Sequence, residues 1–115
     1  MTAYAIAHLR TTPINDEVLE YIERIQDTMN PYAGRFLVHG GMPEVVEGSW
    51  PGTIVIIEFP DLDSARQWYA SPAYQAILPL RTDHLEADTI IIEGVGPDYD
   101  AMATAARLRA AQATA

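Results

Sequence analysis

Hydrophobic and polar residues follow two different periods along the chain, and these periods predict alternating strands and helices. Strand character, with β-branched and aromatic residues and no helical repeat, falls in four segments: 3–10, 35–41, 53–59 and 88–95. Apolar residues at helical spacing follow the first strand: Val18, Leu19, Ile22, Ile25 and Met29. A helix also follows the third strand, capped by Asp61 or Asp63, and Ser71–Pro72 restarts it as an N-cap with proline in the first turn. The order is βαββαβ.

The connection between the second and third strands carries the strongest turn signals. Gly40–Gly41 permits a bulge or an abrupt change of direction, and residues 44–48 are a candidate continuation of the second strand. Residues 49–52 supply a turn, in which Trp50 is a candidate contact to a partner subunit. Pro79 is expected to bend the helix that contains it.

A βαββαβ chain closes most simply as a ferredoxin-like α+β fold, with a four-stranded antiparallel-type sheet and both helices on one face. The strands are apolar on both faces, since Ile54 and Ile56 point one way while Val55 and Ile57 point the other. An uncovered apolar face of this size is unusual on a monomer. We therefore expect a second copy to cover it and form a homodimeric α+β barrel.

Composition limits the possible partners. The formal net charge is -9, and the basic residues form no cluster, so neither nucleic acid nor a membrane is expected to bind. The absence of cysteine excludes thiol catalysis and disulfides. No secretion signal or membrane span is recognisable, which favours a cytoplasmic location. Residues 1–96 are expected to form one domain, and residues 97–115 an Ala-rich tail.

Several short motifs occur in order along the chain: "RFLVHGG", "EVVEGSW", "IVIIEFPDLDSARQWYASPAYQAILPLR" and "IIIEG". Together they resemble the family of unknown function numbered 1330, a member of the dimeric α+β barrel superfamily, over about residues 3–96. One departure is His39, where the family pattern has Arg more often. The resemblance implies the fold and the dimer. It does not imply a reaction, because the superfamily includes cofactor-free monooxygenases, lactone isomerases and haem-dependent enzymes.

Candidate catalytic residues come from the strands. With strand one taken as parallel to strand three and antiparallel to strand four, His8, Glu58 and Asp88 fall at one end of the sheet. A carboxylate there is costly unless it is paired, so Glu58 is either a proton-transfer group or the partner of a basic residue. That partner is Arg35, or His39 if a bulge at Gly40–Gly41 shifts the register. His8 and His39 are candidate proton carriers.

Candidate ligand-binding residues come from the helices that follow the third strand and from the second strand. They are Arg35, Trp68, Tyr69, Tyr74 and Arg81. Tyr74 and Arg81 suit an anionic or carbonyl group. No metal is expected, because the histidines lack metal-ligand spacing, and no cofactor motif is present.

The predicted function is a homodimer that binds a small, partly apolar metabolite. Glu58 with His8 or His39 would handle a proton in cofactor-free isomerisation or oxygenation. The alternative is a non-enzymatic ligand-binding or stress-related dimer in which Glu58 is only paired with Arg35.

Overall fold

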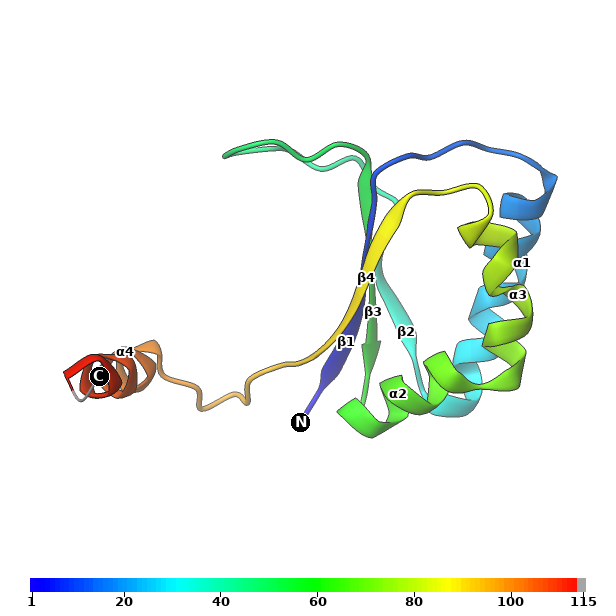
Figure 1. Ribbon diagram of the computed structural model, residues 1–115. Helices are drawn as coiled ribbons and strands as arrows, with labels where there is room; N and C mark the ends of the chain where they lie inside the picture. The colour runs from blue at the N-terminus through cyan, green and yellow to red at the C-terminus, as the bar shows by residue number, and fades with distance from the viewer. Residues whose placement is uncertain (114–115) are drawn as a thin grey trace.

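The computed structural model describes residues 1–113 and confirms the ferredoxin-like α+β fold (Figure 1). The four strands are β1 (Ala3–Leu9), β2 (Arg35–His39), β3 (Thr53–Phe59) and β4 (Ala87–Glu93). The helices are α1 (Asp16–Met29), α2 (Leu62–Ala70), α3 (Pro72–Thr82) and α4 (Ala101–Ala113), and a short 3-10 turn (Asn30–Tyr32) follows α1. The last two residues of the predicted tail lie outside the described residues.

The sheet has the order β2-β3-β1-β4, and every neighbouring pair is antiparallel. The expectation that strands one and three are parallel is therefore wrong. Both crossovers, β1–α1–β2 and β3–α2–α3–β4, skip one strand, so each connects parallel strands that are not neighbours. The strand inserted between β1 and β2 is β3, which runs opposite to both.

The helices begin where side-chain oxygens cap their first turns. Asn15 Oδ1 accepts from the Val18 amide at 2.9 Å, and Asp61 Oδ1 accepts from the Ser64 amide at 2.7 Å. Ser71 Oγ accepts from the amide of Tyr74, and α3 then continues through Pro79 to Thr82.

One face of the sheet is covered by α1, α2 and α3, which pack over it as a single layer (Figure 1). Strand residues that face this layer alternate with residues that face away, as a period of two requires. The core between the two layers contains Ala3, Ala5, Tyr21, Ile25, Met29, Ile57, Phe59, Ala65, Trp68, Tyr74 and Ile77.

The second strand contains a β-bulge, but not at the predicted Gly40–Gly41. Phe36 pairs with Ile57 and Val38 with Ile56, so the register shifts at Leu37, the extra residue between them. The bulge changes which side chains share a face. Phe36 and His39 both face the helices, and their rings stack with centroids 4.0 Å apart.

The other face of the sheet, which we call the open face, has no element of the described chain packed over it (Figure 1). Its apolar residues come from all four strands: Tyr4, Ile6, Val38, Ile54, Ile56, Ile90 and Ile92. Ile90 and Ile92 of the edge strand are 53% and 49% exposed. The predicted apolar character of both faces is confirmed.

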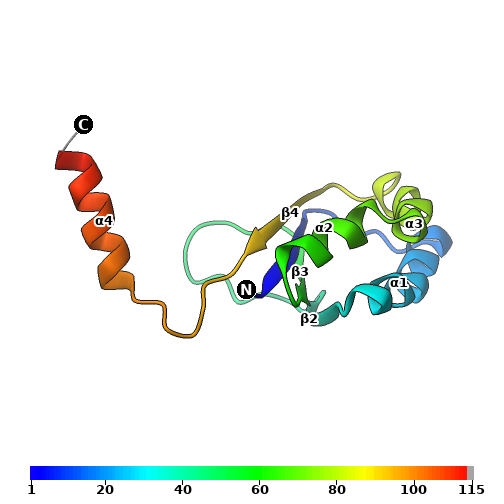
Figure 2. The ribbon, with the colours of Figure 1, turned by 90° about the horizontal axis from the view of Figure 1, so that it is seen from below.

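Two segments extend on the side of the open face (Figures 1 and 2). Residues 40–52 form a long loop between β2 and β3 that carries the exposed Met42 and Val46, so the expected strand at 44–48 is absent. Helix α4 stands apart from the body at the end of an extended linker. The predicted separation of residues 1–96 from the tail stays a prediction, although α4 is helical as its alanine content favours.

Candidate functional site

A cavity of about 430 Å³ lies between the helix-facing side of the sheet and the helices α1 and α3. This volume is within the range of small-molecule sites. Most of its lining is apolar, including Ile22, Ile25, Val55, Ile57 and Leu85. Three polar side chains from the helices also line it: Tyr21, Tyr74 and Arg81.

The three polar side chains form one buried cluster. The hydroxyls of Tyr21 and Tyr74 are hydrogen-bonded at 2.7 Å and join α1 to α3. The guanidinium carbon of Arg81 lies 5.5 Å from the centre of the Tyr21 ring, which is the geometry of a cation–π contact. Two residues predicted to bind ligand, Tyr74 and Arg81, therefore meet at the wall of the cavity.

The ionisation of this cluster is set by burial and by its own members. Burial, and then the neighbouring Tyr74, raises the pKa of Tyr21 far above its usual value. Burial disfavours the charge on Arg81, but the nearby phenolic groups of Tyr21 and Tyr74 outweigh it and raise the pKa of Arg81. At neutral pH the cluster therefore presents the Arg81 cation beside the protonated phenol of Tyr21.

His39 lies on the same cavity, at the end of β2. Desolvation of the ring, which stacks on Phe36, lowers the pKa of His39. Its imidazole is therefore neutral at pH 7 and can accept a proton. The bulge at Leu37 is what places His39 on this face, since regular alternation would have put it on the face of Arg35.

Of the two adjacent aromatic residues of α2, only Trp68 lines the cavity. Its indole N–H donates to Thr28 Oγ1 at 3.0 Å, so its polar atom is already used. Tyr69 is half-buried behind it, with its ring 5.4 Å from that of Tyr74. Trp68 thus provides an apolar wall, and Tyr69 supports the wall from outside.

Glu58 lies on the open face, away from the cavity. It pairs across the strands with Arg35, and two nitrogen–oxygen distances of 3.4 Å join the guanidinium to the carboxylate. Of the two predicted partners of Glu58, the structure selects Arg35. The guanidinium of Arg35 therefore balances the charge of the Glu58 carboxylate. Because this ion pair is partly exposed, it contributes little to stability.

His8 lies at the opposite end of the sheet from Glu58, so their predicted meeting at one end is wrong. In the register of β1 and β3, Tyr4 pairs with Glu58 and His8 with Ile54, a separation of four residues or roughly 13 Å. The cause is the antiparallel direction of β3. The catalytic roles of Glu58 and His8 stay untested, but no shared site contains both.

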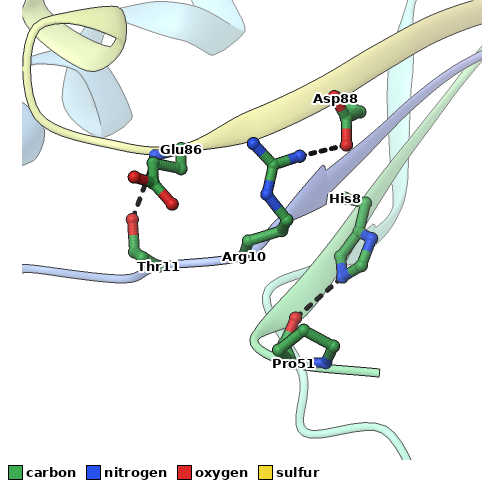
Figure 3. Close-up of polar contacts among 6 residues, drawn as sticks. All are labelled: His8, Arg10, Thr11, Pro51, Glu86 and Asp88. Carbon is green, nitrogen blue, oxygen red and sulfur yellow. Dashed lines mark hydrogen bonds and ion pairs between the residues drawn. The ribbon is translucent and has the colours of Figure 1, made fainter. Parts of the chain in front are cut away.

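The polar contacts around His8 tie the strands to the 40–52 loop (Figure 3). His8 Nε2 lies 2.7 Å from the carbonyl oxygen of Pro51, and its ring stacks on Trp50 with centroids 3.9 Å apart. Nearby, Arg10 pairs with Asp88 of β4. These contacts hold the base of the loop. They give His8 a structural role that requires no ligand.

Tyr21 is the site residue that sequence reasoning missed. It lies three residues after Val18 and four before Ile25, so the helical period that identified those residues also contained Tyr21. Only its position opposite Tyr74 of another helix makes it more than a core residue.

Metal and membrane sites give no further candidate. No group of three metal-ligating side chains occurs within residues 1–113. In the same part of the chain, none of the helices has the length and apolar content needed to cross a membrane.

Comparison with known proteins places the chain within a family and a fold. The family model described as "Domain of unknown function (DUF1330)" matches residues 2–95. No protein with a curated description matches the chain.

Three solved structures are similar over most of their length. A protein of unknown function from Rhodopseudomonas palustris has 13% identity and a TM-score of 0.63, covering 84% of each chain. A dimeric ferredoxin-like protein of unknown function from Jannaschia sp. CCS1 has 10% identity and a TM-score of 0.64, covering 82% of this chain and 100% of that one. A mutant of SnoaB, a cofactor-independent oxygenase from Streptomyces nogalater, has 12% identity and a TM-score of 0.60, covering 86% of this chain and 98% of that one. At these identities the likeness shows the fold alone.

Proposed function

The chain belongs to the DUF1330 family, whose function is unknown, and we propose that it is a homodimer with a small-molecule site in each subunit. The ligand is a small, partly apolar metabolite that occupies the cavity between the sheet and α1 and α3. Its oxygen function faces Tyr21, Tyr74 and Arg81. The observation that carries this proposal is the convergence of these three polar groups on a largely apolar cavity of about 430 Å³.

The open face supports the homodimer. Apolar side chains from four strands lie on it, and a patch of this kind on a monomer rarely exceeds roughly 300–600 Å². A second sheet laid face to face would cover it, and the loop 40–52 extends on the same side (Figure 1). Similar folds from Jannaschia sp. CCS1 and Thermobifida fusca are described as dimeric ferredoxin-like proteins.

Within the site, His39 is the proposed proton acceptor. It is neutral at pH 7 and lines the same cavity as the cationic Arg81. In an isomerisation, His39 would take a proton from a carbon next to a carbonyl group and return it at another carbon, so no co-reactant is needed. Arg81 and the phenols would stabilise the negative oxygen formed between these two steps.

A non-enzymatic ligand-binding dimer is the second candidate. The pairing of Glu58 with Arg35 favours it, because no carboxylate of residues 1–113 then lines the cavity as a general base. Both candidates share the cavity and differ only in whether His39 moves a proton.

A thermal-shift screen of small carbonyl compounds and organic acids tests the shared part. Ala7→Phe puts a ring into the cavity, whereas Ala76→Phe makes the same change at an exposed position of α3. Compounds that raise the melting temperature of the wild type should lose this effect in Ala7→Phe and keep it in Ala76→Phe. If no compound acts, or if Ala7→Phe binds as well as the wild type, the proposed site is wrong.

A further inference from the structure

Arg81 is a buried cation with no acidic partner. Its residue is only 7% exposed, yet no carboxylate of residues 1–113 lies within salt-bridge distance of it. The ion pairs of the described chain use Arg10, Arg24, Arg35 and His84 instead. A buried charge is normally balanced by an opposite charge, and residues 1–113 provide none for Arg81.

The phenol of Tyr21, whose ring faces Arg81, does not supply the missing negative charge. Tyr21 stays protonated because burial raises its pKa. Its ring faces the guanidinium, which makes the cation less costly but does not neutralise it. Arg81 therefore keeps its full charge at the cavity wall.

The cluster also has more hydrogen-bond donors than acceptors. An arginine side chain has five N–H donors and no acceptor, and each tyrosine adds one O–H. The bond between the Tyr21 and Tyr74 hydroxyls uses one of the two phenolic protons. The guanidinium of Arg81 also hydrogen-bonds to both phenolic groups, and among residues 1–113 no further side chain bonds to either hydroxyl. The two phenolic oxygens cannot accept from all of these donors, so one phenolic proton and the remaining guanidinium N–H groups are left for one acceptor group.

The rest of the cavity limits that group to a single charge. Arg81 is the only residue with a full charge at neutral pH among the described residues that line it. The surrounding walls are aliphatic and aromatic, including Ile22, Ile57 and Trp68. A second negative charge would be desolvated there without a partner.

From this arrangement we infer that the site selects apolar organic monoanions, with a carboxylate or enolate oxygen on Arg81 and the Tyr21–Tyr74 pair. The inference rests on the proposed function and specifies its ligand class. The flat guanidinium matches the two oxygens of a carboxylate. The apolar body of the ligand lies between α1 and the strands β1 and β3, against the aliphatic wall.

Three naphthalene probes that differ mainly in charge test this inference on the wild-type protein: naphthalene-2-carboxylate, naphthalene-2-carboxamide and naphthalene-2,6-dicarboxylate. Titration calorimetry at neutral pH gives the affinity of each. The monoanion should bind about tenfold or more tighter than the neutral amide, because a charge-assisted hydrogen bond contributes more than a neutral one. It should exceed the dianion by a similar factor, because the second carboxylate would be desolvated without a partner. Equal binding of the amide, or tighter binding of the dianion, would overturn the inference.

Arg81→Met keeps an apolar side chain of similar length and removes the cation. It should weaken the monoanion about tenfold or more and change the amide by less than about threefold. Arg66→Met makes the same change at an exposed position of α2 and should alter neither affinity. If Arg81→Met binds the monoanion as well as the wild type, Arg81 is not the anion site.

Tyr74→Phe gives a second, independent test if Arg81→Met does not fold. It removes one hydroxyl of the cluster, so the monoanion should lose more affinity than the amide. An equal loss for both probes contradicts the role of the cluster in charge selection. If the wild-type protein binds all three probes with equal affinity, only this inference is wrong. If it binds none of them, the result also counts against the proposed function.

Discussion

Shortening Ile90 on the open face tests whether a second copy of the chain covers it. Ile90 belongs to the edge strand β4, pairs with Ile6 of β1, and is 53% exposed in the single chain. In the proposed homodimer this exposed half would be buried. The variant Ile90→Ala removes most of the buried side chain and leaves the strand intact.

The expected effect follows from the exposed fraction. Burying a whole isoleucine side chain contributes about 1.5–3 kcal/mol, so covering the exposed half contributes about 0.8–1.5 kcal/mol in each subunit. A twofold axis repeats every contact, which doubles the contribution to about 1.5–3 kcal/mol per dimer. Alanine retains part of it, so the dimer dissociation constant should rise about fivefold to thirtyfold.

Sedimentation velocity over a dilution series measures this constant. Leu19→Ala is the matched control, since Leu19 is 42% exposed but lies on α1, on the other side of the sheet (Figure 1). The control should leave the constant unchanged. A wild-type protein that stays monomeric at micromolar concentration, or a dimer that Ile90→Ala does not weaken, would refute the covered-face argument.

Three other predictions concern the turn after the long loop, the ion pair and the histidine. Gly52→Ala should lower the free energy of unfolding by about 2 kcal/mol or more, because Gly52 has a φ of +85° and its added Cβ would overlap the carbonyl oxygen of Leu9 in β1. Urea denaturation measures this, and Gly48→Ala, at a φ of +76° in open space, should cost less. Glu58→Gln removes a partly exposed partner of Arg35 and should cost at most about 1 kcal/mol. The variant should bind naphthalene-2-carboxylate as tightly as the wild type. A loss of affinity would show that Glu58 contributes to the ligand site. Burial lowers the pKa of His39 in the folded state, so the unfolded chain binds more protons at acidic pH. The free energy of unfolding should therefore decline as the pH falls below about 6.5, the usual value for histidine. An NMR titration of the His39 ring should give a midpoint below that value. The variant His39→Gln should reduce the loss of stability in acid. A midpoint at the usual histidine value would contradict the proposed desolvation of His39.

Local patterns were sufficient for the order and limits of most elements. Asn15, Asp61 and Ser71 start helices because a short polar side chain can accept from an amide three residues later, an interaction within one turn. Strand segments were recognisable from their β-branched residues, and their two apolar faces correctly predicted an uncovered sheet surface.

The candidate site was only partly predictable, because its residues meet through contacts that are distant in sequence. Tyr74 and Arg81 were identified as ligand-binding candidates from their chemistry, but their burial beside Tyr21 requires the packing of α1 on α3. The expectation that His8 and Glu58 share one end of the sheet depends on a parallel β1–β3 pair, and this pair is antiparallel. The relative direction of two strands depends on which strands become neighbours in the sheet.

What the sequence determined by itself was the series of elements and the apolar character of both sheet faces, since these depend on residues close together in the chain. What only the tertiary structure decided was which chemical groups share a site. The bulge at Leu37 shows the reason: one extra residue in β2 reverses the faces of the residues beyond it. Its place is fixed by pairing with β3, and this pairing puts His39 beside the cavity and leaves Arg35 with Glu58 on the open face.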